Sequence, residues 1–157
     1  MDINDYLIDQ RGKNWPEMLS GWVGTIPESF TLWLINRFGD AFLVLDDGSV
    51  HLLDVGAGSF TRLADSRQHF AELLDTGENA NSWLMIPLVD ECARSLPALR
   101  ENQCYGFKVP PMLGGGHSLE NVEPLDLAIH YSLLAQIHKR TKELADGTPI
   151  GGVKLEP

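Results

Sequence analysis

Residues 41–55, AFLVLDDGSVHLLDV, decide the fold of this chain. Two runs of apolar, strand-forming residues, 41–45 and 49–55, flank the sequence Asp46-Asp47-Gly48. An Asp-Gly pair supplies the positive φ angles that a tight hairpin turn requires. We therefore expect an antiparallel pair of strands here.

A helix is expected just before this hairpin. Pro27 suits the first turn of a helix, where its missing N–H costs nothing, and Gly39 suits the position just past the end. The apolar residues between them recur at helical spacing, which predicts a helix over 27–38 with one buried face. That face would carry Phe30, Trp33, Leu34 and Phe38.

The segments after the hairpin alternate irregularly between helical and strand-like patterns. Gly56-Ala57-Gly58-Ser59 is expected as a strand-to-helix turn that leads into a helix over 64–74, capped by Asp65 or Ser66. Pro87 either starts a new helix or kinks a longer one. The remaining expected elements are helices over 81–96 and 127–144 and strands over 104–109 and 119–125. This mixture favours the α+β class, as a single domain with a mainly antiparallel sheet packed with helices.

The expected division of the chain has three parts. A chain of 157 residues is long enough to bury most of its unfolded surface without a disulfide. We expect an N-terminal helix and loop over 1–24 and the α+β domain over 25–144. Residues 145–157 contain several Gly and Pro residues and are expected to form a loose tail.

Composition excludes several classes of partner. The chain carries 22 Asp and Glu against 12 Lys and Arg, a net charge of -10. Nucleic-acid binding depends on clustered Lys and Arg, so we expect no nucleic-acid partner. The longest apolar run, Trp83 to Val89, has seven residues, whereas a membrane-spanning helix needs about 20. With two cysteines and no secretion signal at the start, we expect a cytoplasmic protein with reduced thiols and no membrane association.

The histidines and cysteines do not have the spacing of metal ligands. Zinc sites use short paired spacings such as Cys-x-x-Cys or His-x-x-x-His, and this chain has neither. We therefore expect no metal and no cofactor. His130 and His138 are expected to be hydrogen-bonded at the edge of the core, and Cys92 and Cys104 to be small buried hydrophobic residues.

An enzymatic alternative rests on the sequence Leu52-Leu53-Asp54-Val55-Gly56-Ala57-Gly58. It resembles the first motif of Rossmann-type methyltransferases, in which an acidic residue and a glycine loop hold S-adenosylmethionine. Asp54, Gly56 and Gly58 would be the ligand-binding residues. Against this alternative, Phe60 stands where a third glycine would be and the strand belongs to a hairpin, so a structural turn is favoured.

Acidic residues are unevenly distributed. Between Asp40 and Asp54 there are four acids and no Lys or Arg, and between Asp65 and Glu91 there are six acids against Arg67 alone. Such one-signed stretches attract a cationic partner, although a merely soluble surface would have the same composition. The residues that we expect to bind a partner are Asp46, Asp47, Asp75 and Glu78.

Three segments carry a resemblance to known families. Asn79-Ala80-Asn81-Ser82-Trp83-Leu84, the string from Cys104 to Gly115 that contains Lys-Val-Pro-Pro-Met-Leu-Gly-Gly, and His130 with Gln136-Ile137-His138 resemble the Tdi-type immunity domain of type VI secretion systems. The earlier segment, in which Ile26-Pro27-Glu28-Ser29-Phe30 leads to Phe38-Gly39, is similar to the start of the SUKH superfamily of bacterial immunity proteins.

The resemblance implies a domain that neutralises a toxin delivered between bacteria and has no catalytic residues of its own. Toxins of these systems are often nucleases. Our leading hypothesis is a cytoplasmic binding protein whose acidic surface docks on a basic toxin domain. The alternatives are the methyltransferase-type enzyme and a regulatory or scaffold member of the same superfamily without a toxin partner.

Overall fold

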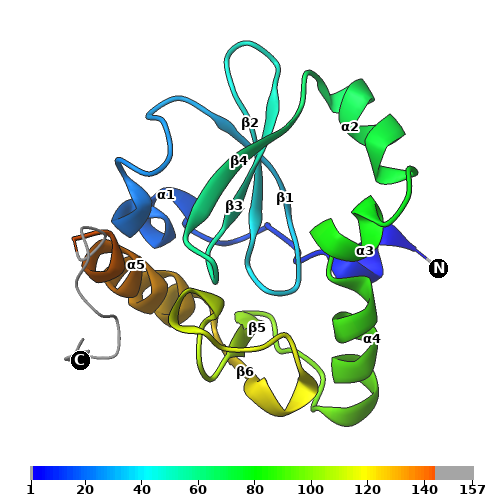
Figure 1. Cartoon of the computed structure of the whole chain (residues 1–157), viewed down its shortest axis with the longest axis vertical. Helices are drawn as coiled ribbons and strands as arrows, with labels where there is room; N and C mark the ends of the chain where they lie inside the picture. Colours follow the sequence, from blue (N-terminus) through cyan, green and yellow to red (C-terminus); the bar gives the residue numbers. More distant parts are fainter. Residues whose placement is uncertain (1, 144–157) are drawn as a thin grey trace.

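The predicted hairpin forms the centre of a four-stranded antiparallel sheet (Figure 1). β2 (Ala41–Val44) pairs with β3 (Val50–Asp54) so that Ala41 lies opposite Leu53. β1 (Thr31–Ile35) and β4 (Ser59–Ala64) complete the order β1-β2-β3-β4. The computed structural model describes residues 2–143.

Helices and a second, two-stranded sheet surround this centre. β5 pairs with β6 in an antiparallel ladder. The further elements are α1 (Trp15–Met18), α2 (Arg67–Leu74), α3 (Asn79–Trp83), α4 (Ile86–Ser95), β5 (Gln103–Phe107), β6 (Val122–Asp126), α5 (Leu127–Glu143) and the short 3-10 helices η1 (Ile3–Tyr6), η2 (Ser20–Trp22), η3 (Pro111–Leu113) and η4 (Leu119–Asn121).

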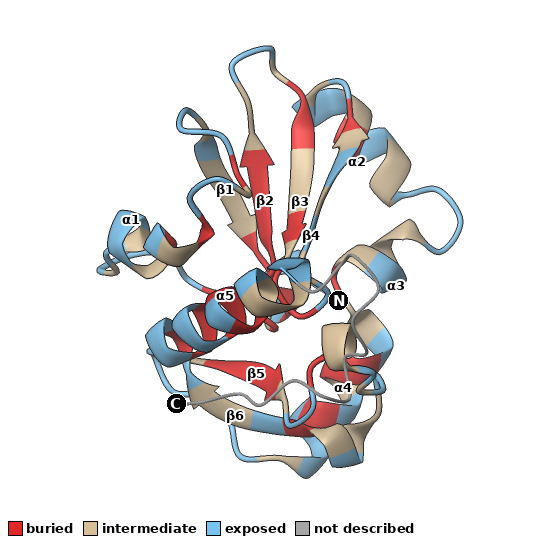
Figure 2. Cartoon of the chain, turned by 60° about the vertical axis from the view of Figure 1, so that its left-hand side comes forward, coloured by how far each residue is buried: buried red, intermediate tan, exposed pale blue. Residues whose placement is uncertain are grey.

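The core lies on both faces of β2. Ala41 and Leu43 point to one face and belong to the same buried cluster as Tyr131 of α5, whereas Phe42 points to the other and packs edge-on against Phe70 of α2. Figure 2 shows that β2 is the most completely buried strand of the sheet. Because both faces are covered, β2 is an unbroken apolar run.

The turn that joins β1 to β2, residues 36–40, fastens α5 to the sheet. The hydroxyl of Tyr131 donates a hydrogen bond to the carbonyl of Gly39 at 2.6 Å. Nε2 of His130 lies 2.9 Å from the carbonyl oxygen of Phe38. Both side chains are almost fully buried, so His130 lies inside the core rather than at its edge.

The expected helix over 27–38 is wrong, because this region contains strand β1. Leu32 packs against one buried cluster and Trp33 against the other, as on the two faces of a sheet. A register irregularity between Leu32 and Leu34 interrupts the alternation, so Leu34 lies with Trp33. A short segment that is apolar on both sides has no clear period, which is why helix and strand are easily confused. Phe38 is therefore not on a helix face, and Gly39 does not follow the end of a helix. Both residues lie in the β1–β2 turn, where Gly39 has a φ of 82°.

The expected strand-to-helix turn at residues 56–59 is also wrong, because it joins β3 to β4. The amide of Gly58 donates to the carbonyl of Asp54 at 2.8 Å, which closes a tight turn between antiparallel strands. The helix expected from residue 64 begins at Arg67 instead. Ser66 is its N-cap, since its side chain accepts a hydrogen bond from the amide of His69.

Other predictions are confirmed. Pro87 lies in the first turn of α4 and therefore starts a new helix. β5, β6 and α5 lie where strands and a helix were expected, although residues 119–121 form η4 and not the start of a strand. The chain is an α+β domain with an antiparallel sheet and packed helices, as expected. The boundary after residue 24 stays a prediction, and the expected tail over 145–157 lies outside the described residues.

Candidate partner-binding site

Asp46 and Asp47 lie at the exposed tip of the β2–β3 hairpin, which projects away from α5 (Figure 1). Both carboxylates have hydrogen-bond partners. The hydroxyl of Ser29 donates to Asp46 at 2.8 Å, and the amide and hydroxyl of Ser49 donate to Asp47. The tip is thus a structured acidic surface.

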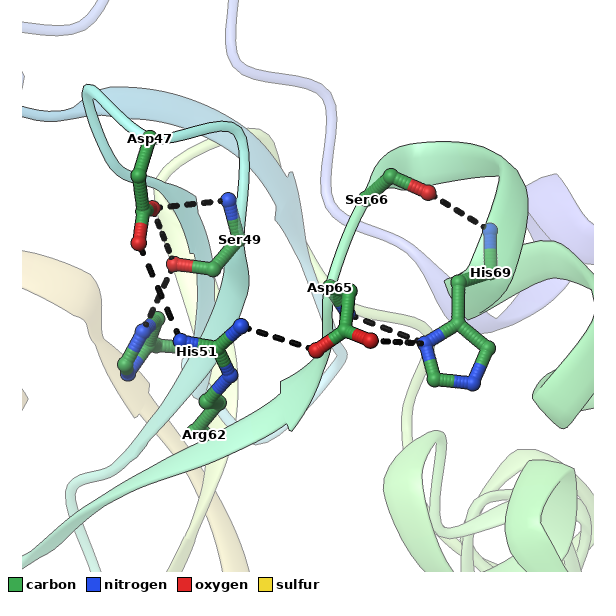
Figure 3. Close-up of polar contacts among 7 residues, drawn as sticks. All are labelled: Asp47, Ser49, His51, Arg62, Asp65, Ser66 and His69. Atoms are coloured by element: carbon green, nitrogen blue, oxygen red, sulfur yellow. Dashed lines mark hydrogen bonds and ion pairs between the residues drawn. The ribbon is translucent and has the colours of Figure 1, made fainter.

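Arg62 of β4 lies beside this tip (Figure 3). Its guanidinium is 3.7 Å from the carboxylate of Asp47 and 2.8 Å from that of Asp65. Hydrogen bonds from Ser49, with a smaller effect of Arg62, lower the pKa of Asp47. Arg62 reaches the hairpin because it lies opposite His51 in the β3–β4 ladder. Sequence reasoning missed this cation because it did not predict β4.

Asp75 and Glu78 lie in the exposed loop between α2 and α3. Asp75 is the C-cap of α2, and the carboxylate of Glu78 accepts a hydrogen bond from the side-chain amide of Asn81 at 2.8 Å. Within residues 2–143, neither forms an ion pair. Figure 1 shows that α2 separates this loop from the hairpin tip, so the four predicted residues form two acidic surfaces and not one.

A third acidic feature lies at the opposite end of the hairpin. The last pair of the β2–β3 ladder is Ala41 with Leu53, and Asp40 and Asp54 are the next residues outward on the two sides. Both line a cleft of about 390 Å³ between the sheet and the corner of α3 and α4. The other lining residues are Leu52, Asn81, Ser82, Trp83, Met85, Pro87, Leu88, Glu91 and His117.

Asp40 is the most deeply buried carboxyl group of this cleft, with 5% of its surface exposed. Its Oδ1 accepts a hydrogen bond from the amide of Val55, and its Oδ2 accepts one from Nδ2 of Asn36, both at 3.0 Å. Burial, together with the nearby charge of Asp54, raises the pKa of Asp40 well above its usual value. Asp40 therefore holds a proton far more readily than an exposed aspartate does.

The wall opposite the sheet is the α3–α4 corner. Met85 there has a φ of 53°, in the left-handed region that side chains other than glycine seldom adopt. Trp83 stacks on Phe70 with 5.3 Å between ring centroids, and its carbonyl accepts a hydrogen bond from Asn36. The corner is thereby fixed to the sheet.

Residues 110–116 form a turn that contains η3 and lies next to the exposed His117. A Cβ added to Gly115 would lie 1.7 Å from the carbonyl oxygen of Val109, so only glycine fits there. The side chain of Asn121 closes the turn by bonding to Val109 and to the carbonyl of Gly116.

The loop of the enzymatic alternative differs from a nucleotide-binding loop. Asp54 accepts a hydrogen bond from the amide of Ala57 at 3.0 Å, and the carbonyl of Gly56 accepts one from the amide of Met112 at 3.1 Å. The loop thus packs against η3. It joins two antiparallel strands, whereas a cofactor loop of this type opens a helix after a parallel strand.

The thiols and the buried histidine have the environment of core residues. Cys92 and Cys104 are both buried, and burial raises the pKa of Cys92 to about 11. Burial lowers the pKa of His130 to about 4. Across residues 2–143, no group of three or more His, Cys, Asp and Glu side chains is arranged to hold a metal ion.

None of the described helices is long and apolar enough to cross a membrane.

Comparison with known proteins gives one family match. Residues 64–138, slightly less than half of the chain, match the family described as "T6SS immunity protein Tdi1, C-terminal", where T6SS denotes type VI secretion. This match supports a type VI secretion immunity domain. It includes the α3–α4 corner and the turn over 110–116. No curated protein matches the chain.

One similar solved structure is described as the crystal structure of Atu4351 from Agrobacterium tumefaciens. The TM-score is 0.51 with 18% sequence identity, over 78% of this chain and 62% of that chain. This chain therefore spans less than two thirds of the length of the solved structure. At this identity the likeness shows a shared fold.

Proposed function

We propose that this chain is a cytoplasmic immunity protein that binds a cognate type VI secretion toxin and neutralises it. The family match over residues 64–138 carries this proposal. The matched part contains α2, α3, α4, β5, β6 and most of α5, together with the loop that bears Asp75 and Glu78. Assignment to the SUKH superfamily belongs to the same proposal.

The proposed partner is a basic toxin domain. The net charge of -10 supports this choice, since opposite charges speed encounter and oppose wrong partners. The hairpin tip with Asp46 and Asp47 and the loop with Asp75 and Glu78 are the proposed contact surfaces. A toxin that acts on nucleic acid fits this chemistry, because a surface that binds phosphates is itself basic. Covering that surface would block the substrate groove.

Co-expression tests the proposal. A candidate toxin, sought among the products of the neighbouring genes, is induced in a susceptible bacterium with or without this chain. We expect growth arrest with the toxin alone and growth with both proteins. A form of the toxin made harmless by an active-site substitution should still be co-purified with this chain. Growth arrest despite a folded, abundant chain, with no co-purification, would contradict the proposal and favour a regulatory or scaffold protein without a toxin partner.

A further inference from the structure

The cleft between β3 and the α3–α4 corner has a mixed chemistry that the proposed contact surfaces lack. Its lining includes the apolar side chains of Leu52, Trp83 and Leu88 together with the buried Asp40 and the half-buried Asp54. Its volume of about 390 Å³ is large enough for one long side chain. A lining with both apolar and acidic groups suits a side chain that has a hydrocarbon stem and a positive head.

The carboxyl group of Asp40 has no positively charged partner in the described part of the chain. Its two hydrogen-bond donors, the amide of Val55 and the side chain of Asn36, are neutral. A carboxylate offers about four acceptor positions, and these donors fill one on each oxygen. The lining of the cleft contains no Lys or Arg, and Asp40 forms no ion pair within residues 2–143.

The hairpin itself forces the two carboxyl groups together. Asp40 and Asp54 flank the last pair of the β2–β3 ladder, Ala41 with Leu53, and Asp40 accepts a hydrogen bond from the amide of Val55, the residue after Asp54. Two like charges this close to each other are unfavourable. Without a cation the repulsion is relieved by a proton on Asp40, consistent with its raised pKa. A cation that enters the cleft would replace this proton, which passes to solvent.

We propose that this cleft is the receptor for one arginine or lysine side chain of the toxin, with Asp40 and Asp54 binding its positive head and the apolar walls enclosing its stem. This inference rests on the proposed function, because it names the feature of the toxin that the chain recognises. Glu91 and His117 also line the cleft and are exposed.

The first test compares matched substitutions in the full chain. Asp54→Asn removes one carboxylate from the cleft, and Glu101→Gln removes one from an exposed position that does not line it. Losing a charge-assisted hydrogen bond costs on the order of 10-fold to 100-fold in affinity. We therefore expect Asp54→Asn to weaken binding of the purified toxin domain by that factor and Glu101→Gln to leave it within about twofold. Equal affinities for both variants would overturn the inference.

A second pair of variants fills the cleft without touching either carboxyl group. Ser82 is exposed on α3 and lines the cleft. Ser82→Arg supplies a guanidinium from the chain itself and should abolish toxin binding, whereas Ser82→Ala should bind like the wild type. Melting temperatures of both variants show that they are folded. Wild-type affinity in Ser82→Arg would contradict an inserted toxin side chain.

A third measurement needs no toxin, so it separates failure of this inference from failure of the proposed function. Carboxyl carbons of Asp40 and Asp54 are followed by NMR while N-acetyl-arginine amide is added at constant ionic strength. We expect a saturable shift of both signals and a lower pKa of Asp40, both reduced in Asp54→Asn. If the toxin binds but neither carboxyl signal responds and the variants bind alike, the cleft inference fails and the immunity function stands. If both signals respond but no toxin binds, the cleft binds the arginine derivative and the proposed function fails. The inference that the side chain comes from a toxin then fails as well.

Discussion

Nδ2 of Asn36 donates a hydrogen bond to Oδ2 of Asp40 at 3.0 Å, which joins the two ends of the β1–β2 turn. The same Nδ2 donates to the carbonyl of Trp83, also at 3.0 Å, while Oδ1 accepts from the amides of Phe38 and Asp40. Asn36 is fully buried. One side chain thus orients the carboxyl group of the cleft and fixes the wall that faces it.

We expect Asn36→Ala to destabilise the protein by about 3 kcal/mol or more, because it leaves several buried polar groups without partners. Urea unfolding, followed by circular dichroism, measures the change. The matched control is Asn102→Ala, at an exposed position, which should change stability by less than about 0.5 kcal/mol. An unchanged unfolding midpoint for Asn36→Ala would show that the turn does not depend on this side chain.

We predict that the turn over 110–116 stabilises the fold and does not contact the toxin. Gly115→Val forces a side chain into the carbonyl of Val109, and Gly114→Val strains a residue whose φ is 92°. Both should lower the melting temperature, Gly115→Val more strongly. Gly116→Ala is the control, since a Cβ there meets nothing within 4 Å. A Gly115→Val protein with the wild-type melting temperature but no toxin binding would instead place this turn in the interface.

Stability should depend on pH through His130. Burial lowers its pKa from 6.5 to about 4, so in this range the unfolded state binds the proton more tightly than the folded state. Neutral His130 makes its full contribution to the free energy of unfolding above about pH 6.5. This contribution is lost as the pH falls toward 4, a difference of about 3 kcal/mol.

We therefore expect His130→Asn to be less stable than the wild type at neutral pH, because it loses the contact with Phe38, yet to have a flatter stability profile between pH 4 and 6.5. Chemical unfolding at a series of pH values measures both. His117→Asn, at an exposed position, should keep the wild-type slope. If the stability of the wild type and of His130→Asn changed equally with pH between 4 and 6.5, His130 would not be the source of the pH dependence.

The hairpin could be predicted from sequence because Asp-Gly acts locally and both strands are apolar. That Asp40 and Asp54 lie near each other could also have been predicted, because both flank the last pair of that hairpin ladder. β1 was missed because its residues are apolar on both faces, which gives no period of two. β4 was missed because it is a half-exposed edge strand with Thr61 and Arg62 at its centre.

The contacts that build the cleft are not visible in local patterns. Asn36 and Trp83 are 47 positions apart, and His130 lies 92 positions from the carbonyl that it contacts. Only the packed chain brings them together. The acidic character of residues 40–54 could be predicted, but the pairing of Arg62 with Asp47 required the position of β4.

Toxin capture should be steered by charge. Exposed charges are screened beyond about 8 Å at physiological salt, so the association rate should fall as salt is raised while dissociation changes less. Of the two hairpin acids, Asp46→Lys should slow association more than Asp47→Lys, because Arg62 already offsets part of the Asp47 charge. Asp75→Lys and Glu78→Lys test the second surface. Surface plasmon resonance measures the association and dissociation rates. If the association rate did not change with salt or with any of the four substitutions, the acidic residues would serve solubility and not toxin capture.

The proposed function requires that this chain forms a neutralising complex with a protein toxin. The most direct measurement mixes the purified chain, in increasing molar ratio, with the active toxin domain identified by co-expression and follows toxin activity and complex formation in the same samples. We expect toxin activity to fall in proportion to the chain added, with a stable complex that accounts for the loss. Full toxin activity in the presence of excess folded chain, with no complex detected, would contradict it.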